Sequence, residues 1–193
     1  KFDKNRSVRI DSLNFNPDGT IQKVIPTLRG VGLTNTRSRI QIDRYSALQG
    51  KGIGIEYLDK NNCFAGWKTL FSKSNTALIY NKVDFGNEKV EEITVRAKSS
   101  KGGVLVVRAD GKKGNIIAKV KIPKSAAWKN VRAQVLHAPQ GVHALHVSLQ
   151  SGADVEVDWL GFDALPWEKG AFETHQYRNL FAEMGYKQAD IDR

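Results

Sequence analysis

Short runs of alternating hydrophobic and polar residues fill the middle of the chain, from residue 39 to residue 162. About ten such runs follow one another at spacings of roughly 8 to 12 residues, with turn-forming residues between them. A period of two is typical of strands with one buried face, and this spacing is typical of antiparallel sandwiches and barrels. No helical period occurs among the runs. The pattern therefore predicts an all-β domain built as a β-sandwich.

Both ends of the chain depart from this pattern. Residues 7–28 hold two β-rich runs on either side of Asn-Pro-Asp-Gly at 16–19, a turn sequence that predicts a hairpin. After Pro166 the apolar residues fall at helical spacing, and Gly185 is placed to end a helix. We therefore divide the chain into an N-terminal hairpin and linker (1–37), a sandwich (38–163) and a short helical tail (164–193).

Composition excludes several classes of protein. The chain has 193 residues, of which 40% are hydrophobic, enough for a real core. No apolar run approaches the roughly 20 residues of a membrane-spanning helix. Cys63 is the single cysteine, which excludes an internal disulfide and a thiolate zinc site. The chain begins at Lys1 rather than Met and nothing at its start is typical of a signal peptide, so we expect it to be a piece of a longer protein.

The formal charge of +10 is a local property of one stretch. Residues 96–132 hold eleven basic side chains and one acid, Asp110. Cations there alternate with apolar residues, as Lys119 and Lys121 do beside Val120, which is typical of the solvated face of a sheet. Nucleic-acid binding is less favoured, because no aromatic residue interrupts positions 96–127. If this face binds a polymer, uronic-acid substituents are the better ligand.

Five ordered motifs in the sandwich region resemble those of family 6 carbohydrate-binding modules. They are Ile-Gln-Ile-Asp at 40–43, Tyr-Asn-Lys-Val-Asp-Phe-Gly at 80–86, Trp128, Gly-Val-His at 141–143 and Val-Asp-Trp-Leu-Gly-Phe at 157–162. The resemblance implies a β-jelly roll that binds plant polysaccharide. Such modules stack flat aromatic rings on the sugar, while polar neighbours hydrogen-bond its edges.

The resemblance carries over to four candidate sugar-binding residues. Trp128 matches the tryptophan of the family's cleft. Counting back from Tyr80 along the family motif places a second ring at Phe71, and Trp67 is the competing assignment because the intervening motif has drifted. Core packing is the alternative for Trp128 and for Phe71. Glu156 stands where the family has an asparagine, and a carboxylate accepts hydrogen bonds from hydroxyls but cannot donate them while ionised.

The family also carries a structural calcium site between its first and last strands. The resemblance assigns this site to Gln41, Asp43 and Asp158, with Gln41 in place of a family glutamate. Calcium takes six to eight hard oxygen ligands, and the alternative is a pair of ordinary exposed acids. Asp154, Glu156 and Asp158 alternate along one strand, but neighbouring strand positions offer no opposite wall for a hydrolysed substrate. These acids therefore do not predict catalysis.

The N-terminal segment resembles a different family. Residues 6–8 and 16–21 are similar to the last strands of family 43 glycoside hydrolases, propeller enzymes that remove arabinose or xylose units. That family's catalytic carboxylates lie on earlier propeller blades, so we do not expect this chain to be an enzyme. We expect a non-catalytic module of a secreted, periplasmic or cell-surface bacterial enzyme, which holds xylan or arabinoxylan near the catalytic domain.

Two other functions remain open at this point. One is a structural sandwich with an eroded cleft that buttresses the catalytic domain. The other, more remote, is binding of nucleic acid or an acidic polymer through the basic face.

Overall fold

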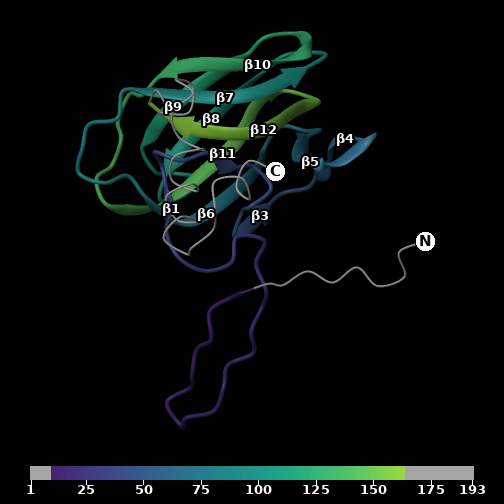
Figure 1. The fold of residues 1–193 in the computed structure, drawn as a ribbon. Helices are drawn as coiled ribbons and strands as arrows, with labels where there is room; N and C mark the ends of the chain where they lie inside the picture. The colour runs from purple at the N-terminus through teal and green to yellow at the C-terminus, as the bar shows by residue number, and fades with distance from the viewer. Residues whose placement is uncertain (1–9, 164–193) are drawn as a thin grey trace, which may run out of the picture.

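The computed structural model describes residues 10–163, and within them the chain forms two six-stranded sheets packed face to face (Figure 1). The predicted all-β class and sandwich are confirmed. The described residues contain no helix, and so none that is long and apolar enough to cross a membrane. The predicted C-terminal helix lies outside the described residues.

The first sheet has the strand order β1-β6-β11-β8-β9, with β3 also paired to β6. All of its pairings are antiparallel except that of β1 with β6. Its strands are β1 (Thr34–Asn35), β3 (Ala47–Gln49), β6 (Thr76–Asp84), β8 (Gly103–Ala109), β9 (Ile116–Ile122) and β11 (Val142–Gly152).

The second sheet has the order β10-β7-β12-β5-β4, with β2 paired to β12. All of its pairings are antiparallel. Its strands are β2 (Ile40–Gln41), β4 (Ile53–Asp59), β5 (Asn62–Phe71), β7 (Glu92–Ser99), β10 (Ser125–Gln134) and β12 (Val155–Phe162).

The core lies between the two sheets and follows the alternation seen in the sequence. In β9, Ala118, Val120 and Ile122 are buried while Lys119 and Lys121 are exposed. The largest fully buried side chains include Tyr80 and Phe71. The Tyr80 hydroxyl donates to the Ile42 carbonyl at 2.6 Å, which satisfies a polar group that burial would otherwise leave without a partner.

The predicted N-terminal hairpin forms its turn but not its ladder. The Gly19 N–H donates to the Asn16 carbonyl at 3.0 Å, and Gly19 takes the positive φ of 83° that the turn requires. Beyond the turn, a single bridge joins Phe15 to Ile21 within the described residues. Both side chains are 60% exposed. A two-stranded hairpin without an apolar surface to cover gains little from burial, which explains the short pairing.

Burial of Phe71 makes it a test of the core. Its side chain is fully buried, whereas Phe64 in the same strand is 95% exposed. We expect Phe71→Ala to lower the free energy of unfolding by about 3–5 kcal/mol, because it leaves a cavity. The matched control Phe64→Ala should change it by less than about 0.5 kcal/mol. Urea unfolding measures both, and equal effects would contradict the assigned orientation of β5.

Candidate functional site

A hollow of about 520 Å³ lies on the outer side of the second sheet. We call it the Trp128 cleft. Trp128 of β10 lines it from one edge strand, and Tyr57 near the tip of the β4–β5 hairpin lines it from the other. Lys68 of β5 and Lys98 of β7, on strands between these edges, supply cationic groups to the same hollow. The cleft therefore combines the Trp128 ring and a second aromatic residue at its other edge with hydrogen-bond donors.

Glu156 lies between these lysines and engages both. Its carboxylate accepts from the Lys68 ammonium and lies 3.3 Å from Lys98 Nζ. Glu56 lies 3.4 Å from Lys68 Nζ on the other side. Burial alone would lower the pKa of Lys68, but the hydrogen bond and charge of Glu156, with those of Glu56, outweigh it and raise that pKa. Lys68 is therefore a buried cation held charged by two carboxylates.

Two cations also lie over the Trp128 ring. Lys98 Nζ lies 5.1 Å from the ring centroid, and Arg96 Cζ lies 5.7 Å from it. Both distances suit a cation–π interaction. Because Lys98 also contacts Glu156, the structure brings Trp128 and Glu156, two of the predicted residues, to a single lysine.

The expectation that Phe71 is a stacking ring is wrong. Phe71 pairs with Ile53 of β4 and Val155 of β12, and its fully buried side chain faces the other sheet. No face of its ring is open to a ligand. Core packing, the alternative reading of this residue, describes its place.

Trp67, the competing assignment, has an open ring. It is 39% exposed and stacks on Tyr57, with ring centroids 4.4 Å apart and ring planes at 26°. Trp67 does not line the Trp128 cleft. It lines a second hollow of about 660 Å³, which we call the rim hollow. The two stacked residues thus line different hollows, Trp67 the rim hollow and Tyr57 the Trp128 cleft.

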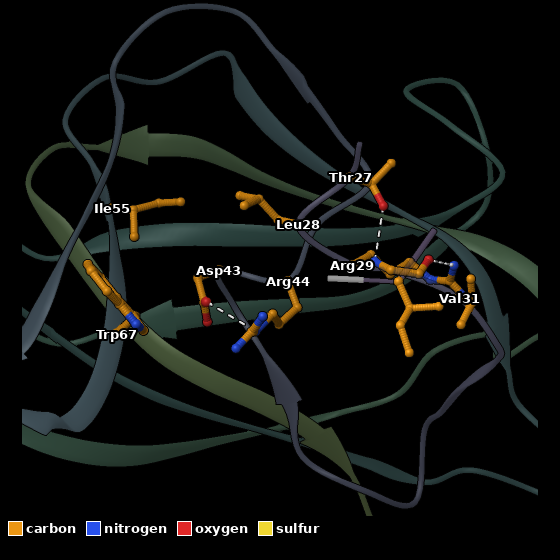
Figure 2. Close-up of a pocket in the computed structure, with 10 residues that line it drawn as sticks. Thr27, Leu28, Arg29, Val31, Asp43, Arg44, Ile55 and Trp67 are labelled. Carbon is orange, nitrogen blue, oxygen red and sulfur yellow. Dashed lines mark hydrogen bonds and ion pairs between the residues drawn. The ribbon is translucent and has the colours of Figure 1, made fainter. Parts of the chain in front are cut away.

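The rim hollow is formed where the N-terminal segment approaches the second sheet (Figure 2). Trp67 and Ile55 lie at one end, Thr27, Arg29 and Val31 lie at the other, and Leu28 and the ion pair between Asp43 and Arg44 lie between them. One of its walls belongs to a segment outside the sandwich.

Sequence reasoning missed Tyr57, Lys68 and Lys98 as members of the candidate site. A signal for Tyr57 existed, because the short β4–β5 connection places it opposite Trp67 in the hairpin register. The buried position of Lys68 carries no such signal. Its partner Glu156 is 88 positions away in the chain, and only the pairing of β5 with β12 brings the two together.

The predicted calcium residues lie together at the pairing of β2 with β12. Gln41 pairs with Trp159, and the Ile42 N–H donates to the Asp158 carbonyl at 3.1 Å. Asp158 is the extra residue of a bulge, since Val157 and Trp159 pair with successive residues of β7.

Two arginines, however, form ion pairs with the carboxylates of Asp158 and Asp43. Asp158 lies 3.2 Å from Arg96 Nε, and Asp43 lies 3.4 Å from Arg44 Nε. Burial raises the pKa of Asp158, and the negative charge of Asp43 adds to this, while Arg96 and Arg39 oppose it. Among residues 10–163 no third Asp, Glu, His or Cys completes a cluster that could hold a metal. Calcium takes six to eight oxygens, and at Asp43 and Asp158 it would have to displace the guanidinium groups that pair with them.

Comparison with known proteins identifies the type of domain. A model of the family "Carbohydrate binding module (family 6)" matches residues 48–164. The chain is similar to the module CsCBM6-3 of Clostridium stercorarium, solved with cellobiose, at 20% identity and a TM-score of 0.61 over 68% of this chain and 97% of that chain. It is similar to a family 6 module of Clostridium cellulolyticum, solved with xylose, at 23% identity and a TM-score of 0.60 over 68% and 100%.

One similar structure is a larger enzyme. This is a family 43 arabinoxylan arabinofuranohydrolase of Bacillus subtilis, solved with cellotetraose, at 20% identity and a TM-score of 0.61. The match covers 79% of this chain but 33% of that enzyme. At these identities the solved structures establish the fold. No curated protein matches the chain.

The buried ion pairs beneath the cleft give a test of stability. We expect Glu156→Gln to lower the free energy of unfolding by about 1–3 kcal/mol, because Lys68 loses one of its two carboxylates while remaining buried. The double variant Lys68→Met with Glu156→Gln should recover most of the loss. Glu88→Gln is the matched control, because the Glu88 side chain is 86% exposed in its pair with Arg37. Urea unfolding that showed no difference between Glu156→Gln and Glu88→Gln would contradict the arrangement.

The arginine pairs at Asp43 and Asp158 predict that calcium does not stabilise the fold. A ligand at 100 times its Kd would add about 2.7 kcal/mol to the free energy of unfolding. We expect the thermal midpoint to be the same in calcium chloride and in a chelator. A midpoint that rises with calcium concentration, and falls back in Asp158→Asn, would show that a calcium site forms.

Proposed function

Because the chain belongs to carbohydrate-binding module family 6, we propose that it binds a neutral plant polysaccharide of the xylan type in the Trp128 cleft and has no catalytic role itself. The observation that supports this proposal is the make-up of the cleft. Trp128 and Tyr57 line one hollow together with Lys68 and Lys98. Aromatic faces and fixed hydrogen-bond donors are the two elements that recognition of a sugar requires.

In this proposal the aromatic rings carry the affinity. A pyranose ring presents weakly apolar C–H groups on its faces, and these pack against an aromatic ring and displace water from it. Trp128 carries the stacking contact, and Tyr57, on the opposite edge strand, lines the other end of the cleft. Such a cleft favours a chain of several units over a single sugar.

The lysines take over the polar contacts. The family's asparagine can donate and accept, whereas Glu156 can only accept, and both lysines already engage it. An ammonium has three N–H groups. Lys98 therefore retains donors for sugar hydroxyls after pairing with Glu156. Glu156 acts as a positioning residue that fixes Lys68 and Lys98, rather than as a sugar ligand.

Xylan or arabinoxylan is the class of ligand that we propose. The Clostridium cellulolyticum module was solved with xylose, and the Bacillus subtilis enzyme is an arabinoxylan arabinofuranohydrolase. The match to that enzyme extends over more of this chain than the matches to isolated modules do. We propose that the parent protein is a glycoside hydrolase of this kind, in which the module raises the local concentration of substrate. Even weak binding is useful in such an arrangement.

A second candidate function is structural, with the sandwich acting as a support for a neighbouring catalytic domain. The N-terminal segment favours this reading, because its apolar side chains are open to solvent. Ile10 is 65% exposed and Ile25 is 77% exposed. Apolar groups of this size are typical of a surface that another domain covers.

Isothermal titration of the full chain with xylohexaose and cellohexaose tests the proposal. We expect wild type to bind xylohexaose, and Trp128→Ala to weaken binding at least about tenfold, or ~1.4 kcal/mol. Tyr57→Ala should weaken it in the same direction. Phe64→Ala is the matched control, since this exposed ring lines neither hollow.

The alternatives give different results in the same experiment. Loss of binding in Trp67→Ala with no effect of Trp128→Ala would move the site to the rim hollow. Absence of heat with wild type and both sugars would leave the structural function in place of binding.

A further inference from the structure

Trp128 lies in an irregular stretch of β10 rather than in the regular ladder. The register of β10 against β7 shifts between Ser125 and Lys129. Residues 126–128 therefore share the single position opposite Lys98. Extra residues of this kind bend a strand and turn its side chains away from their regular directions. The direction of the Trp128 ring therefore depends on side-chain contacts as well as on the backbone pairing.

Two of these contacts come from β7, which sends Arg96 and Lys98 to the same face of the sheet. Residues two apart on a strand share one face at a spacing of roughly 7 Å. Arg96 Cζ lies 5.7 Å from the centroid of the Trp128 ring, and Lys98 Nζ lies 5.1 Å from it. Two successive cations of one strand thus contact a single ring.

Each of the two cations pairs with an acid of the neighbouring strand β12. Glu156 is the Cα partner of Lys98, and its carboxylate lies 3.3 Å from Lys98 Nζ. Asp158 Oδ2 lies 3.2 Å from Arg96 Nε, a buried nitrogen that makes no hydrogen bond. The Asp158 side chain is 10% exposed, and salt screens a partly buried pair much less than an exposed one. The charge of Asp158 therefore holds the Arg96 guanidinium next to the ring.

The extra residue of β12 faces the same part of β7 as the irregular stretch of β10. Val157 and Trp159 pair with successive residues of β7, which leaves Asp158 between them free of the ladder and beside Arg96. Asp154, directly before β12, differs from Asp158 in its surroundings. It lies 2.6 Å from Lys101 Nζ, and neither of these two residues lines the Trp128 cleft.

We propose that Asp158 is a positioning residue for sugar binding, which holds Arg96 against the Trp128 ring and so fixes the orientation in which the ring stacks on a pyranose. This inference rests on the function proposed for the Trp128 cleft. Asp158 is not among the described residues that line the cleft, so it acts through Arg96 rather than by touching the sugar. A ring that is already ordered in the free protein loses less conformational entropy when the sugar binds.

NMR of the free protein tests the positioning without any sugar. We expect Asp158→Asn to lower the heteronuclear NOE of the Trp128 indole N–H, because the ring gains motion once Arg96 is released. Arg96→Gln should have the same effect, and it carries the test if Asp158→Asn folds poorly. Asp154→Asn is the matched control, because it neutralises an acid whose partner Lys101 lies outside the cleft. A Trp128 indole that stays as ordered in Asp158→Asn and Arg96→Gln as in wild type would overturn the proposal.

Titration with xylohexaose measures the consequence for binding. We expect Asp158→Asn to weaken binding about twofold to fivefold, the range that corresponds to loss of one cation–π contact. In the Trp128→Ala background it should have no further effect, because both changes act on one ring. Additive losses in the double variant would overturn the proposal, since Asp158 would then act by another route. Absence of binding by wild type would instead overturn the function proposed for the cleft, an outcome that the NMR measurement separates from a failure of the positioning.

Discussion

The structure depends on one constraint, which is that the space between the two sheets must stay dry. Every central strand meets it by sending apolar side chains inward at alternate positions, as Val120 and Ile122 do in β9. The intervening positions are thereby forced outward, whatever their chemistry. Function is confined to these outward positions and to the loops, and the strand register decides which of them become neighbours.

The cations on the outer faces of the two sheets differ in whether acidic side chains pair with them. On the second sheet, the pairing of β12 with β5 and β7 sets Glu156 between Lys68 and Lys98, so that acids compensate the cations and fix them beneath Trp128. On the first sheet, Arg108 of β8 and Lys119 and Lys121 of β9 form no ion pair with a carboxylate within the described residues.

The sequence was sufficient for the strands and for the family, because both rest on local patterns. Alternation in β9 and the turn at Gly19 need no knowledge of distant residues. The candidate site needed more. The prediction of Phe71 as a stacking ring was wrong because the pairing of β5 with Ile53 and Val155 decides which of its side chains point into the core. Counting residues along a drifted motif does not show which side chains these are. The arginines that pair with Asp43 and Asp158 could not be predicted for a similar reason, because the sequence does not show which cation lies beside a carboxylate in the fold.

The central claim is that a sugar chain lies in the Trp128 cleft and contacts Trp128 and Tyr57. The most direct measurement is a set of intermolecular NOEs between xylohexaose and the aromatic side chains of the full chain. The account predicts NOEs from pyranose C–H protons to the rings of Trp128 and Tyr57, with none to Phe64. NOEs to Trp67 alone, which would place the sugar in the rim hollow, would contradict it.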